Sequence, residues 1–196
     1  DLKTGKVLWN KQVETRLPEP ETIREHGYAA NTPVADRERV YAFFGKSGVI
    51  AFDHSGRQLW HANVGDKTSG WGTAASPVLF GNLVIVNASV ECESLVALDQ
   101  LTGKEVWRAS GIDQSWSAPL LVPVDGKTEL VVPVFAKLLA FDPQSGEQLW
   151  SCNTEIGWYM VPGLVAHDGV VYSIGGRSGG ALAVRAGGRG DVTKTH

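Results

Sequence analysis

The stretch at residues 97–107, ALDQLTGKEVW, decides how the rest of this chain is interpreted. A short apolar run leads into an aspartate, then a polar turn containing a glycine, and finally a tryptophan. Close copies stand at 51–60, AFDHSGRQLW, and at 140–150, AFDPQSGEQLW. A truncated copy, DLKTGKVLW, occupies 1–9, and a fainter one without a tryptophan, LAVRAGGRGDVTKTH, occupies 182–196. The stretch is therefore one unit of an internal repeat.

A proline within a short apolar context keeps the same period. It occurs in NTPVA, ASPVL, SAPLL and MVPGL, at Pro33, Pro77, Pro119 and Pro162, so the intervals are 44, 42 and 43 residues. A fixed period in this range is typical of repeat architectures. The two markers together divide almost the whole chain into equivalent units.

Each unit contains four short runs of β-branched and aromatic residues separated by Gly, Asn, Asp and Ser, which predicts four strands. The turn before the tryptophan has its own chemistry. Asp99 is placed to accept hydrogen bonds from backbone N–H groups just ahead of it, and Gly103 can adopt a positive φ at little cost. The sequence shows no strong helical pattern, although 18–26, PEPETIREH, could form one or two turns.

Four-stranded units of about 40–50 residues in tandem are typical of β-propeller blades. We therefore predict an all-β propeller of four-stranded antiparallel blades, and prefer it to a parallel solenoid, whose coils are usually shorter. The inner strands are expected at about 32–35, 76–80, 118–122 and 161–166. The single domain 1–196 would then hold blades near 28–60, 71–107, 115–150 and 158–196, with 1–9 the end of a preceding blade.

The repeated pattern A-[FL]-D-x-x-[ST]-G-x-x-[LV]-W resembles the tryptophan-docking repeat of the PQQ-like β-propeller family, which includes quinoprotein alcohol dehydrogenases and BamB-type proteins. The resemblance covers almost the whole chain and implies a ring of seven or eight blades, about half of it supplied here. It also implies a periplasmic or secreted location. The ring could be completed by further blades of a longer protein, which we favour, by a second copy in a homodimer, or by closure within one chain.

Composition excludes some functional classes. Hydrophobic residues make up 43% and charged residues 20%, as in ordinary globular domains. The net charge of −3 gives no general attraction to nucleic acid, and no apolar run approaches the roughly 18 residues that a membrane-spanning helix needs. The two cysteines, Cys92 and Cys152, are interpreted as unpaired thiols.

Two sets of aromatic residues have different expected roles. The docking tryptophans recur at one position of the repeat and are interpreted as packing between blades; they are Trp9, Trp60, Trp107 and Trp150. A second set stands three to six residues before the prolines, near the expected mouth of the central channel, and consists of Tyr28, Trp71, Trp116 and Trp158. These rings are the candidates for binding a planar ligand or side chains of a partner.

The family resemblance also raises the question of PQQ and calcium. Calcium prefers six to eight oxygen ligands, whereas the repeated acids Asp53, Asp99 and Asp142 are explained by their turns, and the chain has no adjacent cysteine pair. We therefore predict no cofactor and no metal, and a non-catalytic propeller that binds a protein partner or small ligand. The alternatives are part of a PQQ-dependent alcohol or sugar dehydrogenase, with PQQ and calcium, and a carbohydrate- or polymer-binding module.

Three short motifs are interpreted as chance matches. GRSGG at 176–180 fits the nucleophile elbow of hydrolases, but that elbow joins a strand to a helix, whereas this match is expected between two strands. RGD at 189–191 lies in the weak last copy of the turn. The sequence NAS at Asn87 fits the N-glycosylation pattern.

Overall fold

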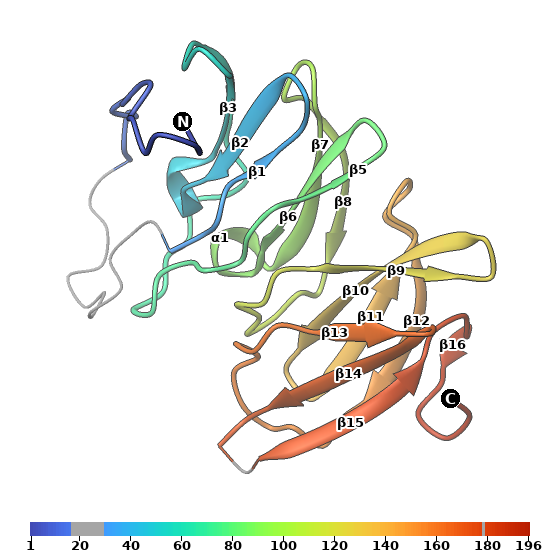
Figure 1. Ribbon diagram of the computed structural model, residues 1–196. Coiled ribbons are helices and arrows are strands. Elements are labelled where there is room, and N and C mark those ends of the chain that lie inside the picture. Colours follow the sequence, from blue (N-terminus) through green and yellow to red (C-terminus); the bar gives the residue numbers. More distant parts are fainter. Residues whose placement is uncertain (17–29, 178) are drawn as a thin grey trace.

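The structure is a computed structural model, and it describes residues 1–16, 30–177 and 179–196. The segment that was expected to allow one or two helical turns, 18–26, lies outside these residues, as does Tyr28. The described chain is almost entirely β-structure, arranged in four sheets that follow one another in chain order (Figure 1). The prediction of an all-β, propeller-type fold is thus confirmed.

The first two sheets each contain four antiparallel strands in sequential order. The strands of the first sheet are β1 (Val34–Ala35), β2 (Arg39–Phe43), β3 (Val49–Asp53) and β4 (Gln58–Ala62). Those of the second are β5 (Val78–Phe80), β6 (Leu83–Ala88), β7 (Ser94–Asp99) and β8 (Glu105–Ser110). The short helical segments η1 (Gly45–Ser47) and α1 (Ser89–Cys92) lie between strands.

The other two sheets depart from the four-stranded plan. The third has the order β16-β12-β11-β10-β9 and contains β9 (Leu120–Val124), β10 (Lys127–Val134), β11 (Lys137–Phe141), β12 (Gln148–Asn153) and β16 (Gly190–Asp191). The fourth consists of β13 (Val165–His167), β14 (Val170–Gly175) and β15 (Gly180–Arg185). The last residues were expected in the fourth sheet, but β16 pairs with β12 in parallel.

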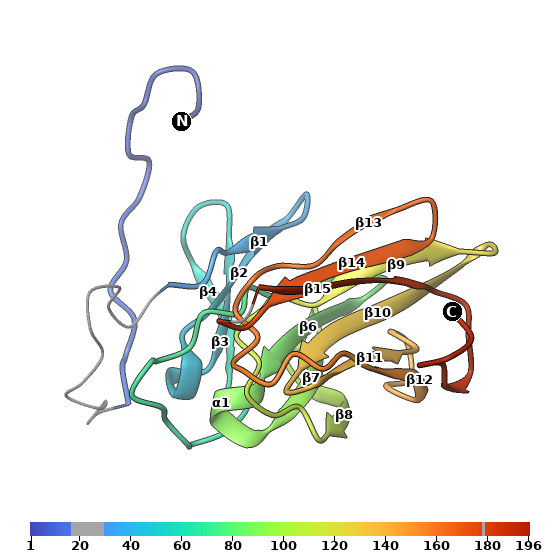
Figure 2. The ribbon, with the colours of Figure 1, turned by 90° about the horizontal axis from the view of Figure 1, so that it is seen from below.

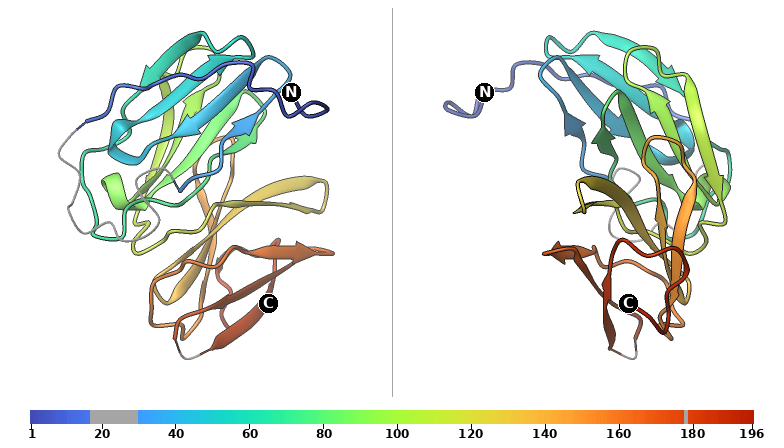
Figure 3. Two further views of the ribbon diagram at one scale, coloured as in Figure 1. Left: turned by 60° about the vertical axis from the view of Figure 1, so that its left-hand side comes forward. Right: turned by 90° about the vertical axis from the view of Figure 1, so that its right-hand side faces the viewer.

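The strand expected to be innermost lies at one edge of every sheet, as a propeller requires. These edge strands are β1, β5, β9 and β13. All four overlap the expected positions, but β13 shares only residues 165–166 with the expected 161–166, because the residues before it belong to the loop that carries Trp158. Seen from several sides, the four sheets are arranged along an arc from blue to red (Figures 1 and 3).

Three hydrophobic cores hold the arc together, one between each pair of successive sheets. Strand β6 shows how one strand serves two cores. Leu83 and Ile85 pack against the third sheet, and Val84 and Val86 pack against the first. Alternate side chains of a strand point to opposite faces, so a sheet enclosed between two neighbours needs apolar residues at every position. This requirement explains the unbroken run LVIV.

The outer faces of the first and last sheets differ. The N-terminal segment extends beside the first sheet (Figure 2), and Trp9 lies 5.9 Å, between ring centroids, from the buried Phe52 of β3. On the fourth sheet, by contrast, Val165, Tyr172 and Ile174 are exposed. In a propeller ring, this apolar face would contact the next sheet.

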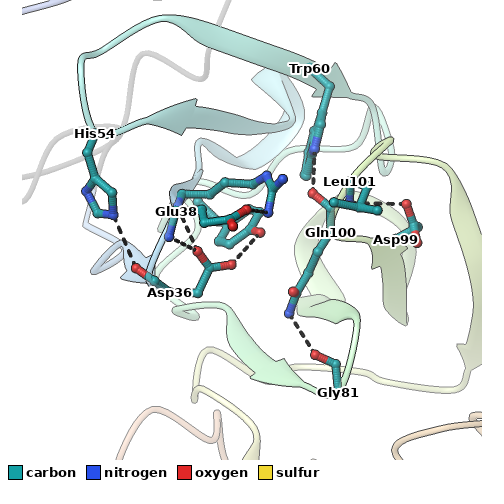
Figure 4. A network of polar contacts seen from close by, with 10 residues as sticks. Asp36, Glu38, His54, Trp60, Gly81, Asp99, Gln100 and Leu101 are labelled. Atoms are coloured by element: carbon teal, nitrogen blue, oxygen red, sulfur yellow. Dashed lines mark hydrogen bonds and ion pairs between the residues drawn. The ribbon is translucent and has the colours of Figure 1, made fainter.

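The docking tryptophans join each repeat to the turn of the following one. The indole Nε1 of Trp60 donates to the carbonyl oxygen of Gln100 at 2.9 Å (Figure 4). Trp107 donates in the same way to Pro143 at 3.2 Å, and Trp9 donates to His54 at 3.0 Å. Each hydrogen bond reaches the residue that directly follows the aspartate of the next turn, so the contact repeats with the sequence.

The turn under each ring has the chemistry that its sequence predicts. The carboxylate of Asp99 accepts hydrogen bonds from the Thr102 hydroxyl at 2.7 Å and from the backbone N–H groups of Leu101 and Thr102. These donors, the hydroxyl first, hold the pKa of Asp99 below its usual range. Gly103 has a φ of +69°, and a Cβ at this position would lie 2.6 Å from the Trp60 ring. Glycine is therefore required here for two reasons, its backbone conformation and the close approach of the indole.

A pair of glycine variants separates these two requirements. Gly126 has a similar φ of +73°, but no atom lies within 4 Å of the position that a Cβ would occupy. Alanine at either position should cost about 1–2 kcal/mol for the left-handed backbone. Gly103→Ala should cost a further ~1–3 kcal/mol because of overpacking against Trp60. Urea unfolding measures the loss of unfolding free energy in both variants. Equal losses in Gly103→Ala and Gly126→Ala would show that the indole does not constrain Gly103.

At the last repeat, a buried carboxylate replaces the usual docking turn. Arg185 stands where the other copies have Asp53, Asp99 and Asp142, so the aspartate turn cannot form. Instead, the buried Glu129 of β10 accepts hydrogen bonds from Trp150 Nε1 at 2.7 Å and from the Gly187 N–H at 3.1 Å. The guanidinium of Arg189 lies 3.2 Å from its other oxygen. This Glu129 cluster directs the chain toward β12 and explains why β16 joins the third sheet.

Candidate functional site

Three of the four aromatic residues predicted at the channel mouth line one pocket. Trp71, Trp116 and Trp158 lie in the loops that lead into β5, β9 and β13, and the equivalent ends of successive sheets bring these loops together. The pocket has a volume of about 430 Å³ and is lined by Ala30, Trp71, Ala74, Trp116, Trp158, Tyr159, Val161 and Arg177. Tyr28, the fourth predicted residue, lies outside the described part of the chain.

Hydrogen bonds tie the three loops to one another. The indole Nε1 of Trp116 donates to the carbonyl oxygen of Gly72 at 2.8 Å. The backbone N–H of Trp116 donates to Met160, and the N–H of Met160 donates to Gln114, at 2.8 and 3.0 Å. The donors of Trp116 are thus used within the protein, and this residue holds the floor of the pocket in place.

A buried polar network anchors the middle loop to the second sheet. The side-chain amide of Asn87 donates to Ser115 Oγ at 2.8 Å and to the carbonyl oxygen of Ser117 at 2.9 Å. Ser89 Oγ accepts a hydrogen bond from the Ser115 N–H. Asn87 is only 1% exposed, so the glycosylation pattern at this position marks a structural amide rather than a surface acceptor.

The aromatic rings form a connected set. Tyr159 contacts Trp116 in an edge-to-face arrangement at 5.0 Å and Trp158 in a tilted one at 5.2 Å between centroids. Such pairs are worth about 0.5–1.5 kcal/mol beyond their buried area. Trp71 and Trp158 are nevertheless 41% and 40% exposed. Trp116 and Tyr159 are thus partly buried within the lining, and Trp71 and Trp158 are its more exposed rings.

Arg177, which was not predicted as a site residue, is the one charged residue among the described residues of the lining. This residue lies in the hairpin between β14 and β15, and its Cζ is 4.6 Å from the centroid of the Trp158 ring. A guanidinium at this distance is attracted to the face of the indole. Among the described acidic side chains, none forms an ion pair with Arg177. The GRSGG match that contains Arg177 did not point to this pocket, because the place of Arg177 beside Trp158 depends on the folding of a later hairpin.

The other sequence motifs lie elsewhere. The GRSGG match is in the β14–β15 hairpin, and its serine lies outside the described residues. In the RGD match, Arg189 pairs with Glu129, and Asp191 belongs to β16. Cys92 and Cys152 are both free thiols. The described residues contain no group of three or more His, Cys, Asp or Glu that could hold a metal ion.

Within the described part of the chain, no helix is long and apolar enough to cross a membrane.

The fold is shared with several proteins of known structure. BamB from Moraxella catarrhalis superposes with a TM-score of 0.58 at 17% identity, over 74% of this chain and 42% of that one. The quinohemoprotein alcohol dehydrogenase ADHIIG from Pseudomonas putida HK5 gives a TM-score of 0.55 at 16% identity, over 82% of this chain and 33% of that one. The computationally designed protein Ika4 gives a TM-score of 0.56 at 17% identity, over 84% of this chain and 96% of that one. These similarities concern the fold.

Sequence comparison is more specific. The outer membrane protein assembly factor BamB of Burkholderia pseudomallei (strain K96243) is 28% identical over 132 residues, which are 66% of this chain and 32% of that protein. The chain thus spans about a third of the length of this relative. A family model matches residues 1–110 and 91–187. These two ranges together cover nearly all of the sheets described above. The chain belongs to the PQQ-like repeat family described as outer membrane protein assembly factor BamB.

Proposed function

We propose that this chain is a non-catalytic propeller module that binds a protein partner at the pocket of Trp71, Trp116 and Trp158. The observation that carries the proposal is the convergence of these rings from three successive loops on one apolar pocket. The family name supports a partner among outer-membrane proteins or their assembly machinery, and with it a location on the periplasmic side of the outer membrane.

The composition of the pocket suits a protein ligand. Tryptophan, tyrosine and arginine are the residues most enriched where protein interfaces bind tightly, and all three are present here. The volume of about 430 Å³ lies within the range of ligand pockets, roughly 300–1,000 Å³. The Trp116 ring, which an internal hydrogen bond holds in place, loses little conformational freedom when a partner binds, which favours affinity.

The lining does not fit the calcium ion that accompanies PQQ in the quinoprotein alternative. Calcium requires several carboxylate or carbonyl oxygens, whereas the described side chains of this pocket offer the Tyr159 hydroxyl and the cation of Arg177. The positive charge would repel a metal ion placed beside it. We therefore propose that the pocket works without a cofactor.

The outer face of the fourth sheet is a second apolar surface, which the proposal assigns to packing. Its exposed Val165, Tyr172 and Ile174 correspond to the side chains that fill the cores between the other sheets. A large exposed apolar patch marks an interaction surface. Further sheets of the same protein, or a second copy in a homodimer, would cover it.

Photo-crosslinking from the pocket tests the protein partner. Val161 lines the pocket and is 58% exposed, and Leu101, on a docking turn, is 64% exposed. We expect Val161→p-benzoylphenylalanine to give adducts with an outer-membrane protein or an assembly component in cells, identified by mass spectrometry. The matched variant Leu101→p-benzoylphenylalanine should not give them. Equal adducts from both positions, or none from Val161, would contradict the proposal.

Two titrations test the alternatives with the same protein. Saturable binding of PQQ with calcium, accompanied by dye reduction with alcohols, would replace the proposal by the dehydrogenase alternative. Quenching of tryptophan fluorescence by soluble oligosaccharides, lost in Trp71→Ala and Trp158→Ala, would support carbohydrate binding. We expect neither response.

A further inference from the structure

We infer that the pocket binds an aromatic side chain of a flexible polypeptide segment that has an acidic residue next to it. The inference rests on the proposed protein-binding function and names the chemistry of the segment that is bound. It follows from two features that the structure brings together: partly exposed aromatic rings that line one pocket, and a guanidinium that lies over one of them.

The aromatic part follows from Trp71 and Trp158, which line the pocket and are 41% and 40% exposed. An aromatic side chain packed against these rings buries a large apolar area and can adopt the edge-to-face or offset arrangements that aromatic rings prefer. Tyr159 already uses these arrangements with Trp116 and Trp158 at centroid distances of 5.0 and 5.2 Å. An added ring would extend a packing pattern that is already formed.

The acidic part follows from Arg177. Its guanidinium lies over the Trp158 ring at 4.6 Å, and none of the described carboxylates pairs with it. A guanidinium recognises a carboxylate with two parallel hydrogen bonds, which are shorter and stronger than hydrogen bonds between neutral groups. Neighbouring Cα atoms are about 3.8 Å apart, so in a flexible segment the carboxylate of the residue next to a ring bound at Trp158 can reach Arg177.

The same lining disfavours a sugar. A sugar carries several hydroxyl groups, and each needs a partner when it is buried. The described side chains of the pocket offer only the Arg177 guanidinium, the Tyr159 hydroxyl and the indole N–H groups. The N–H of Trp116 is already bound to Gly72. An aromatic side chain leaves no such groups unpaired.

Three blocked peptides test the two parts separately. The first is acetyl-Gly-Ser-Phe-Asp-Ser-Gly-amide, the second has Asn for Asp, and the third has Ala for Phe. By calorimetry at low salt, the Phe-Asp peptide should bind about tenfold more tightly than the Phe-Asn peptide, because a charged pair is replaced by a neutral one. The Ala-Asp peptide should show no saturable binding.

Variants at two exposed arginines test which residue causes the preference for the Phe-Asp peptide. Arg177→Gln should bind the Phe-Asp and Phe-Asn peptides equally, and Arg177→Lys should recover part of the preference. Arg37→Gln removes another exposed arginine and the same charge, in the turn between β1 and β2, and should behave like the unaltered protein. Circular dichroism establishes that each variant is folded.

Equal affinity of the unaltered protein for the Phe-Asp and Phe-Asn peptides would overturn the inference, as would binding of the Ala-Asp peptide. A preference that persists in Arg177→Gln would also overturn it. The crosslinking experiment keeps the two proposals apart. If Val161 yields its adducts but no peptide binds, the protein-binding function stands and the aromatic–acidic recognition fails.

Discussion

Trp107→Ala should lower the free energy of unfolding by about 3–5 kcal/mol, the usual cost of removing a buried aromatic ring. Trp107 is 8% exposed and belongs to the core between the second and third sheets. Its ring lies against Gly146, where a Cβ would be only 2.5 Å away. The substitution would leave a cavity between two sheets and leave the carbonyl oxygen of Pro143 without its indole donor.

Urea unfolding followed by circular dichroism measures this loss without relying on the fluorescence of the removed ring. The matched control is Trp9→Ala, because Trp9 has the same contact type but lies half-exposed at the edge of the arc. Trp9→Ala should lower the free energy of unfolding by less than about 2 kcal/mol, near the lower end of the range for truncated apolar side chains. An unchanged melting temperature in Trp107→Ala would refute the packing role of the docking ring.

Glu129→Ala should destabilise the protein by about 2–4 kcal/mol, because it leaves one buried and one partly buried donor without an acceptor. These donors are Trp150 Nε1 and the Gly187 N–H. Trypsin should also cleave faster in the C-terminal segment after Arg185 and Arg189, since the Glu129 cluster holds this segment against β12.

Two further variants make the Glu129 test specific. Glu129→Gln keeps one oxygen that can accept the indole hydrogen bond. Its free energy of unfolding should therefore lie between those of the unaltered protein and Glu129→Ala. Arg189→Ala removes an exposed ion-pair partner and should cost less than about 1 kcal/mol. If Glu129→Ala and Arg189→Ala have equal effects, the carboxylate acts only as an ion-pair partner, and the docking role assigned to it is wrong.

The regular part of the fold could be predicted because it depends on local chemistry that recurs. An aspartate that caps its own turn, a glycine at positive φ and a tryptophan four residues beyond that glycine each act within one repeat. The 42–44 residue spacing of the prolines then predicts how many sheets form. The end of the last repeat could not be predicted in this way. Arg185 removes the turn, and the substitute acceptor, Glu129, is about 60 residues away in the sequence.

The candidate site was predictable only in part, for a similar reason. Trp71, Trp116 and Trp158 all stand shortly before a repeated proline. The periodicity therefore predicted that they lie at the same end of their sheets. Arg177 lies outside the two repeated markers, the proline and the docking turn, and Asn87 looked like a surface motif although it is a buried link between β6 and the loop that carries Trp116.

By itself the sequence determined the repeat, the strand-rich units, the chemistry of the turns and the aromatic character of one mouth. Each of these properties depends on residues close together in the chain or on their regular spacing. The tertiary structure alone decided that the three rings share one pocket, that a cation lies on Trp158 and that the final strand joins the third sheet. These features depend on contacts between residues that are far apart in the chain and follow no period, so they exist only once the sheets have packed.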